Sequence, residues 1–185
     1  INWNPAPDVI QSLTVDPKEL TVTGAVAQTK TYDGNANAAI DLTGATLNGV
    51  VSPDNVTFSG AGTFAQSNAG TGIAVTANLT LGGAEAGNYF LTQPSGLTAD
   101  INQAPQTITF NPLPSKTTAD APFALTATAS SGLTVSYNSS NPLVATISGN
   151  TVTIVGAGST TITASQAGDG NYLAATNVDQ VQVVT

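Results

Sequence analysis

Short runs of alternating hydrophobic and polar residues follow one another along most of the chain, and each run is closed by Gly, Pro, Asn or Asp. The clearest run is "GIAVTANLTL", whose apolar side chains share one face: Ile73, Val75, Ala77, Leu79 and Leu81. A period of two is the pattern of a half-buried β-strand. Because no useful stretch has helical periodicity, the pattern predicts an all-β protein of many short strands.

Two stretches carry the strongest turn signals. Asn48-Gly49 lies between "ATL" and "VVS", and this dipeptide favours a two-residue hairpin because both residues tolerate positive φ. "ATISGNTVTI" predicts a second hairpin around Gly149-Asn150. We therefore expect strand pairing between near neighbours at both places.

A Gly-Asn-Tyr triplet occurs twice, ending at Tyr89 and at Tyr172, 83 positions apart. Between the two lies "QAP" at 103–105, which has the composition of a short hinge. This spacing predicts two small modules, 20–103 and 104–185. They follow a Pro-containing segment, 1–19, that we interpret as a linker or the end of a preceding module.

Residues from about 20 to 101, which open with "LTVTGAVAQTKTYDGN" and close with "GNYFLTQPSGLTADI", resemble the YDG repeat module of very large bacterial surface proteins. Residues from about 106 to 184, including "QTITFNPLPSKT" and the final "VQVV", resemble a bacterial immunoglobulin-like module. The resemblance implies two tandem immunoglobulin-like β-sandwich modules in a stalk or adhesin. It implies no catalytic residues, because these families carry none.

The ionisable residues exclude several functions. The 185 residues include 11 acids and three lysines, with no Arg, His or Cys, and the formal net charge is −8. Such a chain repels phosphate backbones, so we expect neither nucleic acid nor an anionic lipid surface as partner. No apolar run approaches the roughly 20 residues of a membrane-spanning helix. Cys–His catalysis and thiolate or imidazole zinc sites lack their residues.

Calcium is the metal that remains to be considered, because it binds carboxylate, amide and backbone oxygens in loops. Two Asp-Gly-Asn turns are the candidates, with Asp33 and Asn35 in one and Asp169 and Asn171 in the other. Neither has the dense acidic spacing of a known calcium loop. The alternative is a tight turn in which Asp caps backbone amides, so the expectation is no cofactor, with calcium as the rival.

The tyrosines are interpreted as structural residues. In an immunoglobulin-like sandwich, a Tyr near a strand start can bury its ring while its hydroxyl bonds to nearby backbone. Tyr89 and Tyr172 fit such a corner, which predicts the same corner built twice, and Tyr32 in "KTYDGN" is placed with them. The single tryptophan, Trp3, is interpreted as packing at the junction with a preceding module.

Lysine chemistry is the last candidate. Some bacterial surface immunoglobulin-like domains form a Lys–Asn amide crosslink beside a buried acid, and Lys30 and Lys116 are the lysines inside the predicted modules. The simpler interpretation is that each lysine is an exposed residue of an edge strand.

The functional expectation is a non-catalytic, monomeric stalk segment of a large secreted bacterial adhesin that presents a distal binding region outside the cell. Its expected partners are neighbouring modules of the same polypeptide, with a glycan or host-surface protein reached through the parent protein. Two alternatives stay open. One is a module that itself binds a glycan or host protein, and the other is an accessory domain of a secreted polysaccharide-degrading enzyme.

Overall fold

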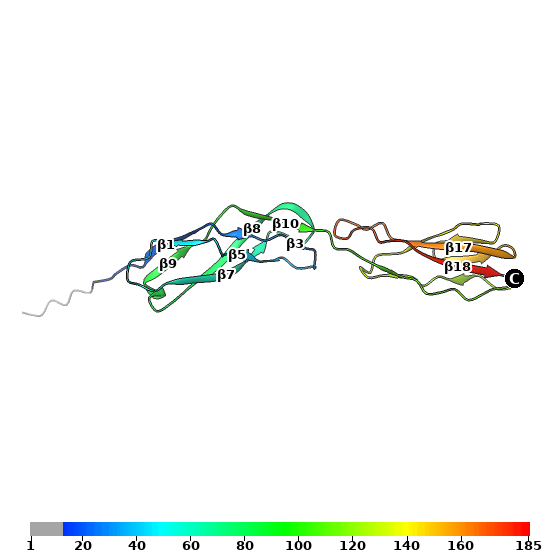
Figure 1. Cartoon of the computed structure of the whole chain (residues 1–185), viewed down its shortest axis with the longest axis horizontal. Coiled ribbons are helices and arrows are strands. Elements are labelled where there is room, and N and C mark those ends of the chain that lie inside the picture. Colours follow the sequence, from blue (N-terminus) through cyan, green and yellow to red (C-terminus); the bar gives the residue numbers. More distant parts are fainter. Residues whose placement is uncertain (1–12) are drawn as a thin grey trace, which may run out of the picture. The chain divides into compact units, whose positions relative to one another are not determined.

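The computed structural model describes residues 13–185, and almost all of its regular structure is β-strand (Figure 1). The one helical element is a single 3₁₀ turn, η1, at Ala86–Asn88. The all-β prediction is therefore confirmed. The interpretations of Trp3 and of the rest of segment 1–12 lie outside the described residues.

The strands before the predicted hinge differ widely in length. They are β1 (Lys18–Thr23), β2 (Val26–Ala27), β3 (Lys30–Thr31), β4 (Asn37–Ala38), β5 (Ile40–Asp41), β6 (Thr46–Asn48), β7 (Thr57–Phe64), β8 (Gly70–Gly82), β9 (Tyr89–Thr92) and β10 (Leu97–Asn102). They form a five-stranded sheet of order β3-β10-β8-β7-β4, a three-stranded sheet β6-β1-β9 and the pair β2-β5.

The long strand β8 has the alternation that its sequence predicts. Its side chains at Ile73, Val75, Ala77 and Leu79 are buried, whereas the residues between them are exposed. β8 pairs with β7 in antiparallel register over eight residue pairs. Ala77 and Leu79 pack with Val22 of β1 in a buried apolar cluster, so the period-two face becomes the core face of this sheet.

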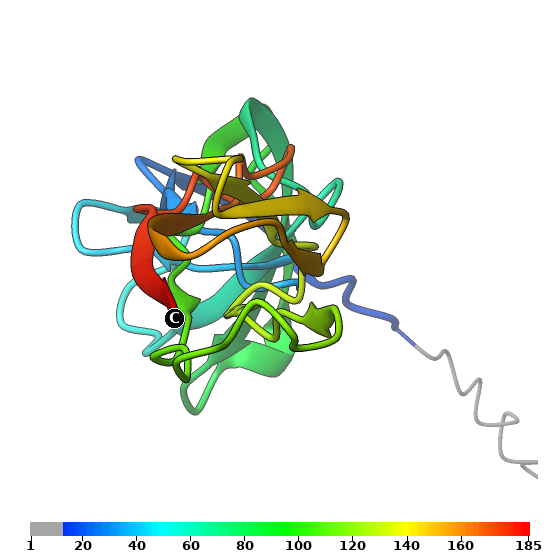
Figure 2. The ribbon, with the colours of Figure 1, turned by 90° about the vertical axis from the view of Figure 1, so that its right-hand side faces the viewer.

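After the hinge, the strands form two three-stranded sheets and one short pair. They are β11 (Ile108–Thr109), β12 (Phe123–Ala124), β13 (Thr128–Ala129), β14 (Ser136–Ser139), β15 (Ala145–Ser148), β16 (Thr151–Ile154), β17 (Gly158–Ser165) and β18 (Val178–Val184). The sheets have the orders β12-β16-β15 and β14-β17-β18, and β11 pairs with β13. Figures 1 and 2 show β17 and β18 side by side, in orange and red.

One apolar cluster joins these sheets. Its buried members come from strands of both sheets, from β11 and from the residues that follow β11 and β12: Ile108, Phe110, Leu125, Ala145, Val152, Ile162 and Ala164. Burying such side chains is the main favourable term in folding a small β-domain. The low charge of the sequence is compatible with a core because Val, Ile and Ala alternate with Thr and Ser.

The two hairpin predictions have different outcomes. β15 and β16 pair in antiparallel register with Ser148 opposite Thr151 and Gly149 at φ +60°, which confirms that hairpin. The Asn48-Gly49 hairpin is wrong, because β6 ends at Asn48 and pairs with the distant β1. Gly49, at φ +101°, lets the backbone pass close to β1, since a Cβ there would lie 2.9 Å from the carbonyl oxygen of Glu19.

The chain divides into two compact units. The first contains the described residues up to Gln28 together with Asn37–Phe64 and Ala74–Thr98. The second contains Thr29–Ala36, Ala65–Ile73 and Ala99–Thr185. Both calcium candidates, and both Tyr32 and Tyr172, therefore belong to the second unit, whereas Tyr89 belongs to the first.

Candidate functional site

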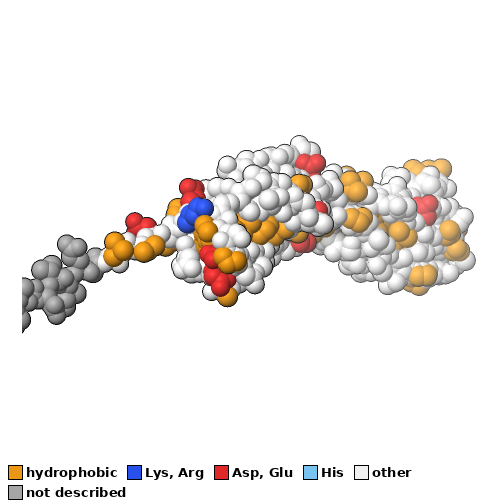
Figure 3. All heavy atoms as spheres, turned by 60° about the vertical axis from the view of Figure 1, so that its left-hand side comes forward, with side chains coloured by type: hydrophobic (Ala, Val, Ile, Leu, Met, Phe, Trp, Pro, Cys, Tyr) orange, Lys and Arg blue, Asp and Glu red, His pale blue; other side chains and the backbone are white. Residues whose placement is uncertain are grey.

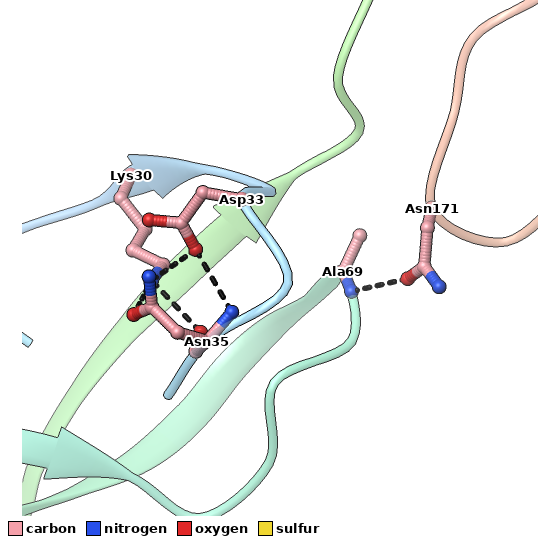
Figure 4. A network of polar contacts seen from close by, with 5 residues as sticks. All are labelled: Lys30, Asp33, Asn35, Ala69 and Asn171. Atoms are coloured by element: carbon pink, nitrogen blue, oxygen red, sulfur yellow. Dashed lines mark hydrogen bonds and ion pairs between the residues drawn. The ribbon is translucent and has the colours of Figure 1, made fainter. Parts of the chain in front are cut away.

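The turn at Asp33 is built around the ammonium group of Lys30 (Figure 4). Lys30 Nζ lies 2.7 Å from Asp33 Oδ1 and donates to both the backbone oxygen and Oδ1 of Asn35, each at 2.9 Å. The Asn35 amide also donates to Asp33 Oδ1. The oxygens proposed as calcium ligands thus surround a cation that the chain itself supplies.

Electrostatics reinforce this arrangement. The hydrogen bond from Lys30 is the main cause that lowers the pKa of Asp33 below its usual value, followed by the bond from the Asn35 backbone. Asp33 is therefore ionised at neutral pH. A metal ion at this turn would have to displace Lys30, and calcium here stays a prediction.

The second Asp-Gly-Asn turn is held by its own backbone. Asp169 Oδ1 accepts from the amides of Asn171 at 2.8 Å and Tyr172 at 2.9 Å, which is the capping role expected of Asp in a turn. Gly168 precedes it at φ +78°, where a Cβ would collide with the carbonyl of Tyr172. The hydrogen bonds of this turn therefore explain Asp169, and its positive φ explains Gly168.

The Asn171 side chain bonds to another segment, whereas the Asp169 side chain bonds within its own turn. Its Oδ1 accepts from the Ala69 amide at 2.9 Å (Figure 4), and its Nδ2 donates to Asn68 Oδ1 at 3.3 Å. Gln103 Nε2 also donates to the Asp169 carbonyl oxygen. Within the second unit, this turn is therefore a point where three segments far apart in the sequence meet. Calcium at Asp169 and Asn171 likewise stays a prediction.

Tyr89 forms a corner of the kind that the sequence suggests. Its side chain is buried, and its hydroxyl accepts from the Val51 amide at 3.1 Å and donates to Asp54 Oδ2 at 2.6 Å. The bond to Asp54 raises the pKa of Tyr89. Glu85 completes the corner by accepting from the Asn55 amide, so two acids and one phenol fix the loop before β7.

Tyr172 does not repeat that corner. It is partly exposed, and its ring meets the ring of Tyr32 edge to face, with centroids 5.4 Å apart. Its backbone forms an isolated parallel bridge with Ala104. The expectation of one corner built twice is therefore wrong. Tyr89 begins the strand β9, whereas Tyr172 forms only an isolated bridge with Ala104.

The tyrosine that packs against the core cluster of the second unit is the partly buried Tyr137, which sequence reasoning missed. Its ring packs on Phe110 with centroids 5.8 Å apart, and its hydroxyl donates to the Ala127 carbonyl at 3.3 Å. The available signal was the alternation in "LTVSYNS", which puts Val135 and Tyr137 on one face. The repeated Gly-Asn-Tyr triplet indicated Tyr172 instead.

Lys116 has an ordinary structural contact. Its Nζ lies 5.0 Å from the centre of the Phe123 ring, within the range of a cation–π interaction. The amide crosslink proposed for Lys30 or Lys116 needs an uncharged amine as nucleophile. The Lys30 amine is instead engaged by Asp33 in an ion pair and by Asn35 in two hydrogen bonds.

The groove along β8 has no reacting group. The groove along β8, of about 460 Å³, is lined by Ala74–Ala77 and by Gln93–Thr98, and none of these residues is ionisable or aromatic. Within residues 13–185 no three His, Cys, Asp or Glu side chains gather as a metal site would require. The same part of the chain contains no helix that is long and apolar enough to cross a membrane.

The all-β structure is compatible with a modular protein of immunoglobulin-like domains. Two family models agree: the YDG domain matches residues 16–96, and the intimin immunoglobulin-like domain matches residues 124–168. A search of curated proteins found no match. The YDG match precedes the immunoglobulin-like match, in the order that the sequence predicts.

These domain types are adhesin and immunoglobulin-like families rather than catalytic ones. The pair fits a surface adhesin of bacterial type.

Proposed function

We propose that this chain is a non-catalytic, load-bearing segment of a large secreted bacterial surface adhesin, and that it holds a distal binding region away from the cell. The two domain types support an adhesin. The observation that carries the mechanical role is the direction in which terminal strands pair. In each of the predicted modules, 20–103 and 104–185, an early segment pairs in parallel with a late one.

In the immunoglobulin-like module the parallel pairing is direct. The Lys116 amide donates to the Val183 carbonyl at 2.9 Å, and the Thr185 amide donates to the Lys116 carbonyl at 2.9 Å. The Thr118 amide donates to the Thr185 carbonyl at 3.2 Å. An early segment is thus bonded alongside the last strand, and both run the same way.

The YDG module has two such pairings. β1 pairs in parallel with β9 from Lys18 opposite Tyr89 to Thr21 opposite Thr92, and Thr92 donates to Glu19 at 2.6 Å. β10, the last strand before the hinge, pairs in parallel with the early strand β3. Neither terminal strand is joined to its parallel partner by a hairpin.

Tension along the chain pulls an early strand toward its N-terminal end and a late strand toward its C-terminal end. For parallel neighbours these directions are opposed along the ladder, so the interstrand hydrogen bonds are loaded together in shear instead of opening one by one. A segment that transmits force between a cell and a distal site needs this property. Its surface needs only to be soluble and non-adhesive, which the net charge of −8 favours.

Single-molecule force unfolding of the chain between inert handles tests the proposal. We expect discrete unfolding events, one for each module, with a gain in contour length of roughly 3.3–3.6 Å for each residue released. Lys116→Pro removes the amide that donates to Val183 and lowers the unfolding force of the immunoglobulin-like module. One lost hydrogen bond corresponds to about 0.5–1.5 kcal/mol.

Lys116→Ala is the matched control, because it keeps the backbone donor and removes only the contact with Phe123. Extension without discrete events, or equal forces for the two variants, would count against a load-bearing role. Binding of the isolated chain to a glycan array would favour the binding-module alternative.

A further inference from the structure

The last strand, β18, has polar residues on its inner face and apolar residues on its outer face. Val181 and Val183 are 56% and 40% exposed, whereas Gln182 between them is fully buried and Gln180 is half-buried. The alternation of "QVQV" alone predicts the opposite orientation, with the valines against the core. Burying an amide costs free energy unless hydrogen bonds replace those to water. The inward glutamines must therefore have partners inside the module.

Those partners belong to the segment that runs beside β18. Residues 111–115 form no strand and include two prolines, which have no N–H group to donate. Gln180 Nε2 donates to the Phe110 carbonyl at 2.8 Å, and Gln182 Nε2 donates to the Pro114 carbonyl at 3.0 Å. Glutamine side chains thus supply donors that bind this segment to β18.

These contacts extend the backbone pairing of the same two segments. The Lys116 amide and Gln182 Nε2 donate to one carbonyl, that of Val183, at 2.9 and 2.8 Å. Gln182 therefore lies next to the point where backbone pairing begins. We call this row of contacts the glutamine seam, and its positions follow the same order in both segments, as parallel neighbours require: Phe110, Pro114 and Lys116 beside Gln180, Gln182 and Val183.

Neutral amides suit this position better than charged groups. The chain has three lysines and no arginine, and Figure 3 shows few charged side chains on the face that it presents. A buried ammonium group would need a buried anion to compensate for its lost hydration. A glutamine brings two N–H donors to a carbonyl oxygen without a charge.

Equilibrium stability alone does not account for Gln182. Its Oε1 is buried and has no hydrogen-bond partner among the described residues. An apolar side chain of the same length would lose the donor bonds but would also remove this unpaired oxygen, so the two changes oppose each other in the free energy of unfolding. What an apolar side chain cannot supply is a directed bond between the two segments.

We propose that Gln180 and Gln182 carry tension across the glutamine seam, together with the backbone bonds of Lys116. Tension pulls the early segment toward its N-terminal end and β18 toward its C-terminal end, so it loads these bonds in the same direction. The glutamines lengthen the row of bonds that must break together. This inference rests on the mechanical role proposed above and names the side chains that perform it.

Unfolding of the full chain at constant force tests the proposal. Gln180→Met and Gln182→Met keep the length of each side chain and remove its donors. Each lost bond should raise the unfolding rate of the immunoglobulin-like module at constant force by about two- to tenfold. The urea midpoint of Gln182→Met should change little, because its opposing effects nearly cancel. Parental unfolding rates at constant force in both variants would overturn the proposal.

Val152→Ala is the matched control. Val152 is fully buried on β16, which pairs with β12 and β15 rather than with β18. This variant should lower the urea midpoint because it leaves a cavity, while its unfolding rate at constant force stays close to that of the parent chain. If the rate instead rose in proportion to lost stability in all three variants, the glutamines would be ordinary structural residues and the proposal would be wrong.

Lys116→Pro, the variant of the force test above, separates two kinds of failure. If it lowers the unfolding force while both glutamine variants unfold like the parent chain, the mechanical role stands and the role of the glutamines is wrong. If none of the three variants unfolds more readily under force, the mechanical role itself is wrong.

Discussion

Tyr89 and Tyr172 end identical Gly-Asn-Tyr triplets, yet their side chains have different surroundings. The Tyr89 ring is 8% exposed and its hydroxyl bonds to Val51 and Asp54. The Tyr172 ring is partly exposed and meets the ring of Tyr32 edge to face, with centroids 5.4 Å apart. A three-residue motif specifies a local turn, whereas the use of its aromatic ring depends on which strand follows.

The two Asp-Gly-Asn turns differ in the same way. Asp33 is paired with Lys30, three residues earlier, whereas Asp169 caps the amides of its own turn. Both arrangements satisfy a carboxylate without a metal ion. The difference is that the first turn depends on a single side chain, Lys30, that the second turn lacks.

The largest expected effect separates the two tyrosines. Tyr89→Ala removes a buried ring and leaves a cavity, so the thermal midpoint of the first unit should fall by more than about 10 °C. Tyr172→Ala removes a partly exposed ring and should lower the midpoint of the second unit by less than about 5 °C. Calorimetry of both variants measures this, and equal losses would mean that the triplets have equivalent roles after all.

Removing the hydroxyl groups of Tyr89 and Tyr137 should have smaller effects on stability, and the two effects should differ. Tyr89→Phe leaves the Val51 amide without its acceptor and Asp54 without its donor, whereas Tyr137→Phe removes one bond of 3.3 Å to Ala127. Because unpaired buried groups cost more than a lost weak bond, Tyr89→Phe should be the more destabilising change. Urea unfolding of the two variants gives the ranking, and the opposite order would contradict the corner described at Tyr89.

Acid titration tests the difference between the two turns. The pKa of Asp33 is lowered chiefly by Lys30, so its contribution to stability is present above the ordinary value of 3.8 and is lost as pH falls through the lowered pKa. Lys30→Met should move the Asp33 pKa upward, as followed by carboxyl NMR. Asp41 is the internal control, because its pKa is lowered by the Thr43 amide and should not change.

Calcium should have little effect on either turn. Lys30 is bonded to the oxygens of Asp33 and Asn35, and Asn171 Oδ1 is bonded to the Ala69 amide. We expect the same thermal midpoint in excess EDTA and in millimolar calcium. A rise of several degrees with calcium would instead establish Asp33 or Asp169 as a metal ligand and would make these modules calcium-stiffened.

The smallest expected effect is no change in mass. An amide crosslink between Lys and Asn releases ammonia, a loss of about 17 Da, and requires an unprotonated amine. Since the Lys30 amine is already bonded to Asp33 and Asn35 within its own turn, we expect the intact mass to equal that calculated from the sequence. A deficit of this size, mapped to Lys30 or Lys116 by peptide sequencing, would establish the crosslink.

The sequence alone was sufficient where the determining contacts are local. Alternation predicted the buried face of β8, and Gly149-Asn150 predicted the hairpin between β15 and β16. The order of a YDG module and an immunoglobulin-like module could likewise be inferred from extended stretches of residues. Each of these depends on neighbours along the chain or on a long, specific pattern.

Tertiary structure decided everything that depends on distant partners. Asn48-Gly49 has the residues of a hairpin, but β6 pairs with β1 instead. The paired residues Asn48 and Thr21 are 27 positions apart in the sequence. Tyr137 rather than Tyr172 packs against Phe110, and the parallel pairings of β1 with β9 and of β10 with β3 join segments separated by about 70 residues. Turn propensity acts over two to four residues, whereas burial and strand pairing are settled only when the whole sheet has formed.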